Sequence, residues 1–539
     1  MMEERIVVVG SGASGVHFAW TALQNGHRVL MIDVGRRRRV DYVRPADDFE
    51  ALKSNLEDPV QHFLGDRFEA LILPGHDGEY YRFPPEKSYV FEPITTFRHQ
   101  AIGFSPLFSF AAGGLAEVWT GGSYPFNDGE LGEFPFGYEK LAPYYSEVAR
   151  RIGISGEDDD LARFYPLHDH IQEPLVLDEH SDCLLKAYQK CRHALNEPLG
   201  CYVGRARIAT LTRDLGGRKA CSYTGRCLWG CPTGALYIPS LTLEQCRQHE
   251  NFEYLDGHFA THFRFDSGRQ VRKVVSVSTE TGETVETGCS SLVLAAGTLC
   301  SSMILMRSIY EDSGQLITLS GLMDNRQVLM PFLNLRMIGK PFEAKSYQYH
   351  QLAIGVDGGS PMDYVHGLVT TLKTALIHPI IQSIPMDLGT SVRLFRNLHA
   401  ALGLVNVNFS DNRRESNYLC LEPTNGGPPR LVVHYQPEAG EPERIARTIR
   451  LFRKILWKLG CVAPPPMTHI RPMGASVHYA GTIPMSRTSK ALTCTEYCQS
   501  HDFENLYFAD GCSFPALPAK NLTFTLMANA VRVAEQVFG

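Results

Sequence analysis

The first residues of the chain alternate between short apolar runs and glycine-rich breaks, a pattern that predicts strand, helix and strand. The apolar run 7–9 stops at Gly10, Gly12 and Gly15, which have the spacing G-x-G-x-x-G. In this spacing the first glycine permits a sharp turn, the second lets backbone approach a pyrophosphate, and the third allows close packing of helix on strand. A second strand is predicted over residues 28–32. The pattern therefore indicates a βαβ unit whose turn binds phosphate.

An acidic residue follows the second predicted strand. Asp33 lies about 20 residues beyond the glycine turn, where a carboxylate can bind a ribose hydroxyl. Strand, turn, helix and acid together predict a site for an adenine dinucleotide, without deciding between NAD and FAD.

Hydrophobic patterning predicts further elements along the rest of the chain. They are a helix running from about 137 to 152, a strand meander over 252–285, a buried strand over 291–298, a helix over 299–307, alternating segments at 333–337 and 402–409, and an amphipathic helix over 443–459. At 539 residues the chain exceeds the size at which one hydrophobic core keeps growing, so we expect two large folding units, interleaved in sequence.

The charge balance excludes a general affinity for nucleic acid. The 52 basic and 58 acidic residues are mixed along the chain and leave a net charge of -6. The basic run 36–39 is interpreted as a solvated loop, with attraction of an anionic group as the alternative. No apolar run reaches the roughly 20 residues that span a bilayer. The predicted strand at the N-terminus leaves no room for a signal peptide, so a cytoplasmic protein is expected.

Three cysteines lie close together at Cys221, Cys227 and Cys231. An iron–sulfur cluster is one interpretation, but a cubane takes four thiolates and C-x2-C repeats are missing. Zinc is another, if Cys201 or a histidine joined them. We favour a buried structural loop near the cofactor, with reduced thiols in place of disulfides, and predict no metal ligands.

Two C-terminal stretches carry residue types suited to chemistry beside a cofactor. The first, 477–485, contains His478, and the second places Asp510 after a short strand at 506–508. A helix is predicted from Asn521, with this asparagine as its N-cap. The N-terminus of such a helix offers free N–H groups to an electron-rich ring edge.

Taken together, these motifs resemble those of the glucose-methanol-choline oxidoreductases, a family of FAD enzymes. The resemblance rests on the first glycine turn, the glycine-rich segment 110–123, the Pro-Tyr-Tyr helix at 143–145, the Ala-Ala-Gly strand end at 295–297, the segment 478–482 and the tail 510–521. It covers the cofactor domain nearly end to end, whereas the substrate region matches only in length and order.

The resemblance implies an α/β and α+β protein with two domains. One is an interleaved, Rossmann-like FAD-binding domain, and the other is a substrate-binding domain with a mixed or antiparallel sheet covered by helices. The expected FAD-binding domain comprises residues 1–45, 86–150, 215–307 and 471–539. The substrate-binding domain and its excursions are expected at 46–85, 151–214 and 308–470.

The resemblance also implies which residues hold FAD. Asp33 is expected near the adenosine ribose, where the family often has Glu, and Asp510 near the pyrophosphate or ribityl part. The backbone near Gly114 and Ala116 is expected to face the isoalloxazine. The segment 116–119 lacks the histidine that links flavin covalently in some family members, so noncovalent FAD is predicted. The predicted cofactor-binding residues are Gly10, Gly12, Ala13, Ser14, Gly15, Asp33, Gly113, Gly114, Ala116, Ala296, Gly297, Asp510, Gly511, Asn521 and Thr523.

The active-site pair of the family maps onto His478 and Asn521. Alcohol oxidation requires removal of the hydroxyl proton and transfer of a hydride to flavin N5, and a neutral imidazole suits the first step. His478 is therefore the predicted base, and Asn521 is predicted to donate its amide N–H to the same substrate oxygen.

The predicted reaction is oxidation of a CH–OH group in a sugar, glycoside or polyol-like alcohol, with oxygen or another acceptor taking the electrons. A steroid or other apolar alcohol is the alternative, suggested by the apolar run 375–381. Three weaker hypotheses are a flavin-bound lyase without net redox change, an NAD-dependent dehydrogenase and a noncatalytic flavin-holding protein. No nucleic-acid partner and no transmembrane segment are expected.

Overall fold

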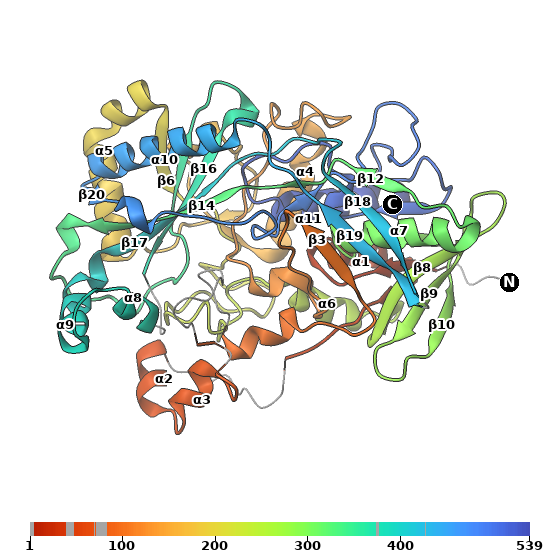
Figure 1. The fold of residues 1–539 in the computed structure, drawn as a ribbon, viewed down its shortest axis with the longest axis horizontal. Helices are drawn as coiled ribbons and strands as arrows, with labels where there is room; N and C mark the ends of the chain where they lie inside the picture. The colour runs from red at the N-terminus through yellow and green to blue at the C-terminus, as the bar shows by residue number, and fades with distance from the viewer. Residues whose placement is uncertain (1–4, 39–47, 69, 72–83, 373–376, 426) are drawn as a thin grey trace.

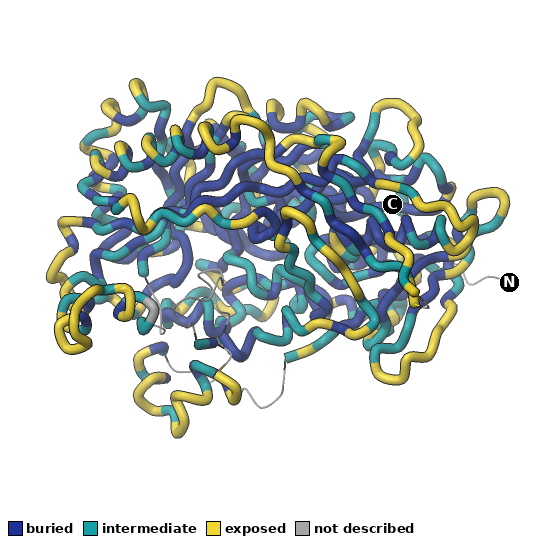
Figure 2. The backbone as a smooth tube through the Cα atoms, in the orientation of Figure 1, coloured by how far each residue is buried: buried dark blue, intermediate teal, exposed yellow. Residues whose placement is uncertain are grey.

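Two β-sheets organise the protein, and helices cover both. The computed structural model describes residues 5–38, 48–68, 70–71, 84–372, 377–425 and 427–539. In Figure 1 the strands β6, β14, β16 and β17 of one sheet lie at the left, and the helices α1 and α11 lie toward the right. Buried segments run through the interior of both parts, while the exposed segments are mostly loops and helix surfaces (Figure 2).

The first sheet is parallel and has five strands among the described residues. Its order is β23 (Leu506–Phe508), β11 (Ser291–Leu294), β1 (Ile6–Val9), β2 (Val29–Ile32) and β7 (Phe252–Leu255). Every residue of β1 and β2 is buried, as expected for parallel strands covered on both faces. Helix α1 (Ala13–Gln24) follows β1 and packs against α11 (Thr523–Phe538), which also contacts α4 (Ala142–Ile152). The first and last helices therefore lie together beside one sheet.

All the described strand pairs of the second sheet are antiparallel. Its order is β20 (Cys461–Val462), β14 (Gln327–Asn334), β17 (Leu402–Asn408), β16 (Val365–Thr371), β15 (Leu352–Val356) and β6 (Cys201–Arg205), with β21 (His469–Ile470) also paired to β14. One face packs on α5 (Glu179–Leu199) and α10 (Glu441–Lys458), whose apolar side chains share a core cluster with the strands. A Cβ on Gly367 would lie 2.9 Å from the Phe452 ring of α10. Because side chains alternate along a strand, His366 and Leu368 point to the opposite face.

Four smaller sheets complete the strands of the described residues. They are β12 (Thr318–Ser320), β18 (Tyr418–Thr424), β19 (Gly427–His434) and β3 (His99–Ile102); β10 (Thr284–Gly288), β9 (Val271–Ser278) and β8 (His258–Phe265); β13 (Met323–Asp324) with β22 (Tyr479–Ala480); and β4 (Ile154–Ser155) with β5 (Ile171–Gln172). The remaining helices are α2 (Phe49–Asn55), α3 (Pro59–Leu64), α6 (Pro239–Arg247), α7 (Thr298–Ser313), α8 (His378–Gln382) and α9 (Leu388–Leu398).

The structure corrects two details of the predicted elements. Residues 335–337, predicted to continue an alternating segment, form a 3-10 turn because the Asn334 side chain accepts a hydrogen bond from the backbone N–H of Arg336 at 3.1 Å. The predicted meander over 252–285 is divided, since β7 joins the parallel sheet and only β8 to β10 form antiparallel pairs.

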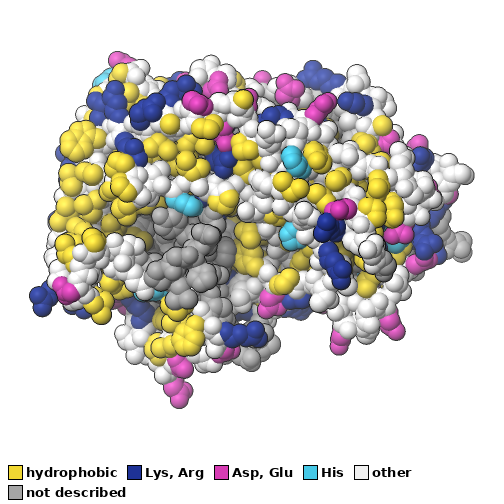
Figure 3. Space-filling model, in the orientation of Figure 1, with side chains coloured by type: hydrophobic (Ala, Val, Ile, Leu, Met, Phe, Trp, Pro, Cys, Tyr) yellow, Lys and Arg dark blue, Asp and Glu magenta, His cyan; other side chains and the backbone are white. Residues whose placement is uncertain are grey.

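The surface carries both signs of charge. On the face drawn in Figure 3, Lys and Arg side chains are interspersed with Asp and Glu. Over the described ranges, no helix is both long and apolar enough to cross a membrane.

Candidate functional site

The predicted phosphate turn joins β1 to α1. Gly10 has φ +100°, a left-handed conformation that favours glycine. A Cβ on Gly15 would lie 2.0 Å from the Gly10 carbonyl oxygen, so a side chain there cannot be accommodated without a shift of backbone. At Gly12, by contrast, a Cβ would meet no atom within 4 Å. Open space therefore lies in front of the turn where α1 begins, and the free N–H groups of a helix N-terminus suit a diphosphate.

A second glycine-rich segment lies against this turn. A Cβ on Gly114 would be 3.3 Å from the Gly12 Cα, and the Gly113 N–H donates to the Ser11 hydroxyl at 2.9 Å. Gly113 has φ +90° and Gly114 has φ +64°. The two glycine segments, about a hundred residues apart in sequence, thus approach each other closely enough to face one ligand.

Asp33 lies at the end of β2 and contacts the phosphate turn. Its Oδ2 accepts hydrogen bonds from the Ser11 N–H at 3.2 Å, the Ser11 hydroxyl and the Tyr254 hydroxyl at 3.2 Å. Burial raises the pKa of Asp33 to about 6, against the lowering effect of these hydrogen bonds. Contact with a ribose stays a prediction for this residue.

Asp510 stabilises the turn that follows β11. Its Oδ2 accepts from the Gly297 N–H at 3.0 Å and the Ser301 hydroxyl at 2.5 Å, and its Oδ1 accepts from the Cys512 N–H at 3.0 Å. Burial raises the pKa of this carboxyl. The same turn packs on the phosphate turn, because a Cβ on Gly10 would lie 2.6 Å from the Ala295 carbonyl oxygen.

The predicted cofactor residues therefore come from separate segments that meet around the carboxyl end of the parallel sheet. Those that keep some exposure are Gly10, Gly12, Ala13, Asp33, Gly114, Ala116, Ala296, Gly297, Asn521 and Thr523. Those buried behind them are Ser14, Gly15, Gly113, Asp510 and Gly511. Open space at Gly12, close backbone approach at Gly114 and an available helix N-terminus fit a dinucleotide such as FAD.

The two predicted catalytic residues lie side by side. The Asn521 Nδ2 is 3.5 Å from the His478 Nε2, although the residues are far apart in sequence. Burial lowers the pKa of His478 to about 4, with a smaller effect from Arg471. The imidazole is therefore neutral at physiological pH, which is the state that a base requires.

The prediction that Asn521 caps a helix is wrong. Helix α11 begins at Thr523, its N-cap position is Leu522, and no side chain caps it. The Asn521 side chain points to His478 instead, and its Oδ1 has no hydrogen-bond partner within the described part of the chain. The amide oxygen is thus available to bind a ligand, while the amide nitrogen lies beside His478.

A buried aspartate, Asp324, anchors the loop that carries His478. Asp324 accepts hydrogen bonds from the Gly474 N–H at 2.6 Å and from the Ser476 hydroxyl, and the Ser476 oxygen accepts from the His478 N–H at 3.0 Å. Burial raises the pKa of Asp324 to about 7. Val477 has φ +59°, which is unfavourable for a β-branched residue and is typical of a functional site whose surroundings impose the geometry.

Two residues near His478 and Asn521, Tyr124 and His366, were not predicted from the sequence. A Cβ on Gly122 would lie 3.2 Å from the Asn521 Oδ1 and 3.1 Å from the Tyr124 ring, whose centroid is 4.4 Å from that of His366. Tyr124 and His366 are fully buried, yet the Tyr124 hydroxyl and the His366 Nε2 have no hydrogen-bond partner among the described residues. A histidine beside apolar residues in a strand segment was the available signal for His366.

The cysteine loop forms part of a hydrophobic cluster. Cys221, Cys227 and Cys231 pack with Tyr347, and burial raises the pKa of Cys227 well above its usual range. No group of three or more His, Cys, Asp or Glu side chains in the described ranges is arranged to hold a metal ion.

The described arginines of the basic run pair with carboxylates. Arg36 binds Glu92 at 2.7 Å, Arg37 binds Asp256 at 3.3 Å and Arg38 binds Glu86 at 2.7 Å. The fourth residue of the run, Arg39, lies outside the described residues, as do Ala375 and Leu376 of the apolar run. The pairs neutralise much of the positive charge predicted for this segment.

The chain is similar to known proteins of one enzyme family. A family model described as GMC oxidoreductase matches residues 414–530. The chain is 24% identical to paromamine 6'-oxidase of Streptomyces fradiae, covering 99% of this chain and 91% of that protein. It is 23% identical to 2-methyl-1,2-propanediol dehydrogenase of Mycolicibacterium austroafricanum, over 75% of this chain and 74% of that protein. The crystal structure of pyridoxine 4-oxidase from Mesorbium loti has a similar fold, with a TM-score of 0.62, 17% identity and 99% of both chains covered.

Proposed function

Because the chain belongs to the glucose-methanol-choline oxidoreductases, it acts on CH–OH groups, and we propose that its substrate is a polyhydroxylated alcohol of the sugar or glycoside type. The family, the fold class, the FAD dependence and the oxidoreductase class predicted from sequence are confirmed. The substrate class, the noncovalent state of FAD and the roles of individual residues are proposals.

One observation supports a polar substrate over an apolar one. Asn521 Oδ1, Tyr124 Oη and His366 Nε2 are buried polar atoms on side chains that lie near one another, and none of them has a hydrogen-bond partner among the described residues. Leaving a buried polar group unsatisfied costs about 1–3 kcal/mol, so these atoms are best explained as groups that bind a ligand with several hydroxyls. The relative from Streptomyces fradiae, whose name gives paromamine as substrate, is consistent with this class.

The residues around the substrate carbon have complementary roles. The His478 Nε2 takes the hydroxyl proton of the substrate, and the Asn521 Nδ2 donates a hydrogen bond to the same oxygen. Tyr124 and His366 bind more distant hydroxyls and orient the ring of the substrate. Gly10 to Gly15 and the backbone at Gly114 would hold FAD, which would supply the hydride acceptor.

Burial supports the proton step. The low pKa of His478 keeps the imidazole neutral above about pH 5, and the surrounding protein excludes water that would compete for the proton.

The test measures whether alcohols from a panel reduce the bound flavin in the absence of oxygen. Reduction is seen as loss of the yellow absorbance, or bleaching. We expect paromamine, other aminosugars, glycosides and polyols to bleach the flavin, and sterols and simple apolar alcohols to leave it yellow. Replacement of His478 by alanine is expected to slow bleaching by roughly 100-fold or more while FAD stays bound. Bleaching by sterols alone would refute the substrate class, and a fully active alanine variant would refute the assignment of the base. An oxygen electrode then distinguishes an oxidase from a dehydrogenase.

A further inference from the structure

We propose that Asn325 is a positioning residue that holds His478 in the tautomer with its lone pair on Nε2. The proposal rests on the function proposed above, in which that nitrogen takes the substrate proton. Asn325 lies in the two-residue connection between β13 and β14, is 1% exposed, and its Oδ1 lies 2.9 Å from the His478 Nδ1. No residue with this role was identified from the sequence.

The orientation of the Asn325 amide follows from its other two partners. Its Nδ2 donates to the Phe409 carbonyl oxygen at 2.8 Å and to the Pro518 carbonyl oxygen at 3.0 Å. Both partners can only accept hydrogen bonds, so the NH2 group must be on their side and the amide oxygen must face the histidine. An amide oxygen can only accept, and the His478 Nδ1 therefore carries the proton.

The tautomer of His478 is thereby determined. A neutral imidazole has one N–H and one lone pair, so a proton on Nδ1 leaves the lone pair on Nε2. Nε2 is the nitrogen that lies 3.5 Å from the Asn521 Nδ2. The same amide also links the histidine to the segment of Asn521, because Pro518 is only three residues before it. A single buried side chain thus aligns both members of the pair.

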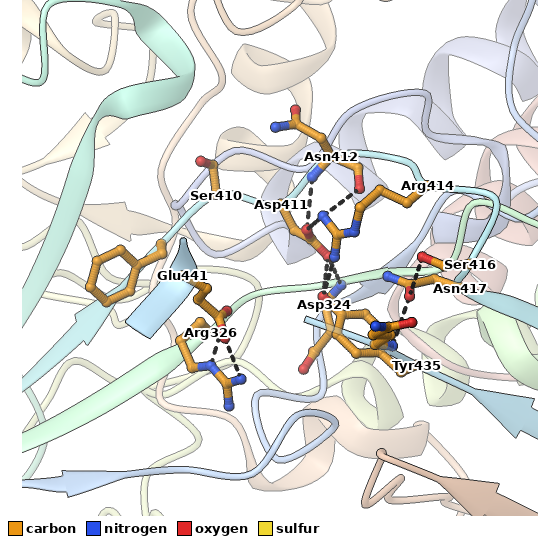
Figure 4. Close-up of polar contacts among 12 residues, drawn as sticks. Asp324, Arg326, Ser410, Asp411, Asn412, Arg414, Ser416, Asn417, Tyr435 and Glu441 are labelled. Atoms are coloured by element: carbon orange, nitrogen blue, oxygen red, sulfur yellow. Dashed lines mark hydrogen bonds and ion pairs between the residues drawn. The ribbon is translucent and has the colours of Figure 1, made fainter. Parts of the chain in front are cut away.

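Asn325 itself is held rigidly because its two neighbours are anchored. On one side, the Asp324 N–H donates to the Asp411 Oδ2 at 3.0 Å, and Asp411 is bound in turn by Arg414 at 2.8 Å (Figure 4). On the other side, Arg326 forms a buried ion pair with Glu441, with Nη2 and Oε2 2.7 Å apart (Figure 4). Displacement of the Asn325 backbone would break one of these networks.

Asn325, which lies beside His478, carries no charge, and this affects the pKa of the histidine. A carboxylate at this position would stabilise the imidazolium and raise the pKa of the histidine, whereas an amide orients the ring without adding charge. The other charged or titratable groups near His478 are Arg471, which lowers its pKa, Asp324, reached through Ser476, and the buried His366. Asn325 therefore sets the ring orientation and leaves the base uncharged.

The test compares Asn325→Asp and Asn325→Leu with the wild type by stopped-flow bleaching of the bound flavin. This signal comes only from folded, FAD-loaded molecules. We expect Asn325→Asp to move the acid limb of the pH profile for bleaching to higher pH by about 1–3 units, because a carboxylate beside the Nδ1–H favours the charged ring. Asn325→Leu, which removes the acceptor, should slow bleaching by roughly 10–100-fold at all pH values. Asn334→Leu is the matched control, since Asn334 is a buried asparagine at the other end of β14 that caps a turn, and it should leave the pH profile unchanged.

An unchanged acid limb in Asn325→Asp, or a bleaching rate in Asn325→Leu within about twofold of the control variant, would overturn the proposal. The alanine variant of His478 separates this result from failure of the proposed function. If that variant is inactive while the Asn325 variants behave like wild type, the base assignment stands and the positioning role is wrong. If it remains active, the proposed function itself fails.

Discussion

Lys520, the residue before Asn521, allows a quantitative test of how the Asn521 segment is held. Its side chain and that of Glu130 are both fully buried, with Nζ and Oε2 2.5 Å apart. Lys520 also donates to the carbonyl oxygens of Pro125 at 3.0 Å and Phe164 at 2.6 Å. This one ammonium group therefore ties the Asn521 segment to two other segments of the chain.

The contribution of the Lys520–Glu130 ion pair to stability depends on the balance between charge attraction and the cost of burying both charges. At an effective dielectric constant of about 20, unit charges 2.5 Å apart attract each other by roughly 6–7 kcal/mol. Burial opposes this attraction, since it raises the pKa of Glu130 and lowers the pKa of Lys520. Lys520→Met leaves a buried carboxylate without its partner, which typically costs about 3–5 kcal/mol in free energy of unfolding. Lys520→Met combined with Glu130→Leu removes both charges, so we expect the double variant to recover about 2–3 kcal/mol of that loss.

The assay is urea unfolding of the FAD-loaded variants at matched pH, followed by circular dichroism and flavin fluorescence. The pH dependence has a definite sign. Glu130 in the single variant has a folded pKa above its unfolded value, so ionising it is unfavourable. The destabilisation should therefore grow as the pH rises above the unfolded pKa of about 4.3, by at most about 1.4 kcal/mol per pH unit. A single variant within about 1 kcal/mol of wild type, or a double variant no more stable than the single one, would refute this reasoning.

Three further predictions concern the cofactor turn, the base and a thiol. Gly15→Ala should abolish FAD retention, measured as flavin absorbance after gel filtration, because its Cβ would lie 2.0 Å from the Gly10 carbonyl oxygen; a yellow variant would contradict this. The bleaching rate of the wild type should be constant above about pH 5.5 and fall below about pH 5, because the neutral fraction of His478 decreases as the pH drops toward its pKa of about 4; an acid limb near pH 7 would refute the lowered pKa. Cys498 is completely buried, and a hydrogen bond from Cys494 is the main cause that lowers its pKa to about 7. Iodoacetamide should therefore label Cys498 slowly in the native protein and quickly in urea. Rapid labelling of the native protein, detected by mass spectrometry, would contradict the burial of this thiol.

The local elements near the cofactor could be predicted from sequence because their determinants are local. Strand β1, its glycine turn and α1 follow from nine consecutive residues whose apolar and glycine positions leave few alternatives. The amphipathic helix α10 was likewise evident from its repeating apolar stripe. The domain boundaries and the individual roles of the cofactor residues stay predictions.

The residues that complete the candidate site could not be predicted because they depend on contacts between distant segments. Nothing around Asn325 in sequence indicates that its amide binds His478, Phe409 and Pro518 at once. Asn521 was interpreted as a helix cap because a polar residue before a helix usually is one, and the neighbouring imidazole reverses that assignment.

The sequence by itself determined a dinucleotide turn, the types of residue suited to alcohol oxidation and the enzyme family that these motifs resemble. Only the tertiary structure decided which nitrogen of His478 faces Asn325, that Asp324 holds the loop of His478, and that Tyr124 and His366 carry buried polar atoms without a partner among the described residues. The physical reason is that strand and turn preferences act between near neighbours, whereas the tautomer, pKa and orientation of a buried side chain are determined by its partners in the folded core.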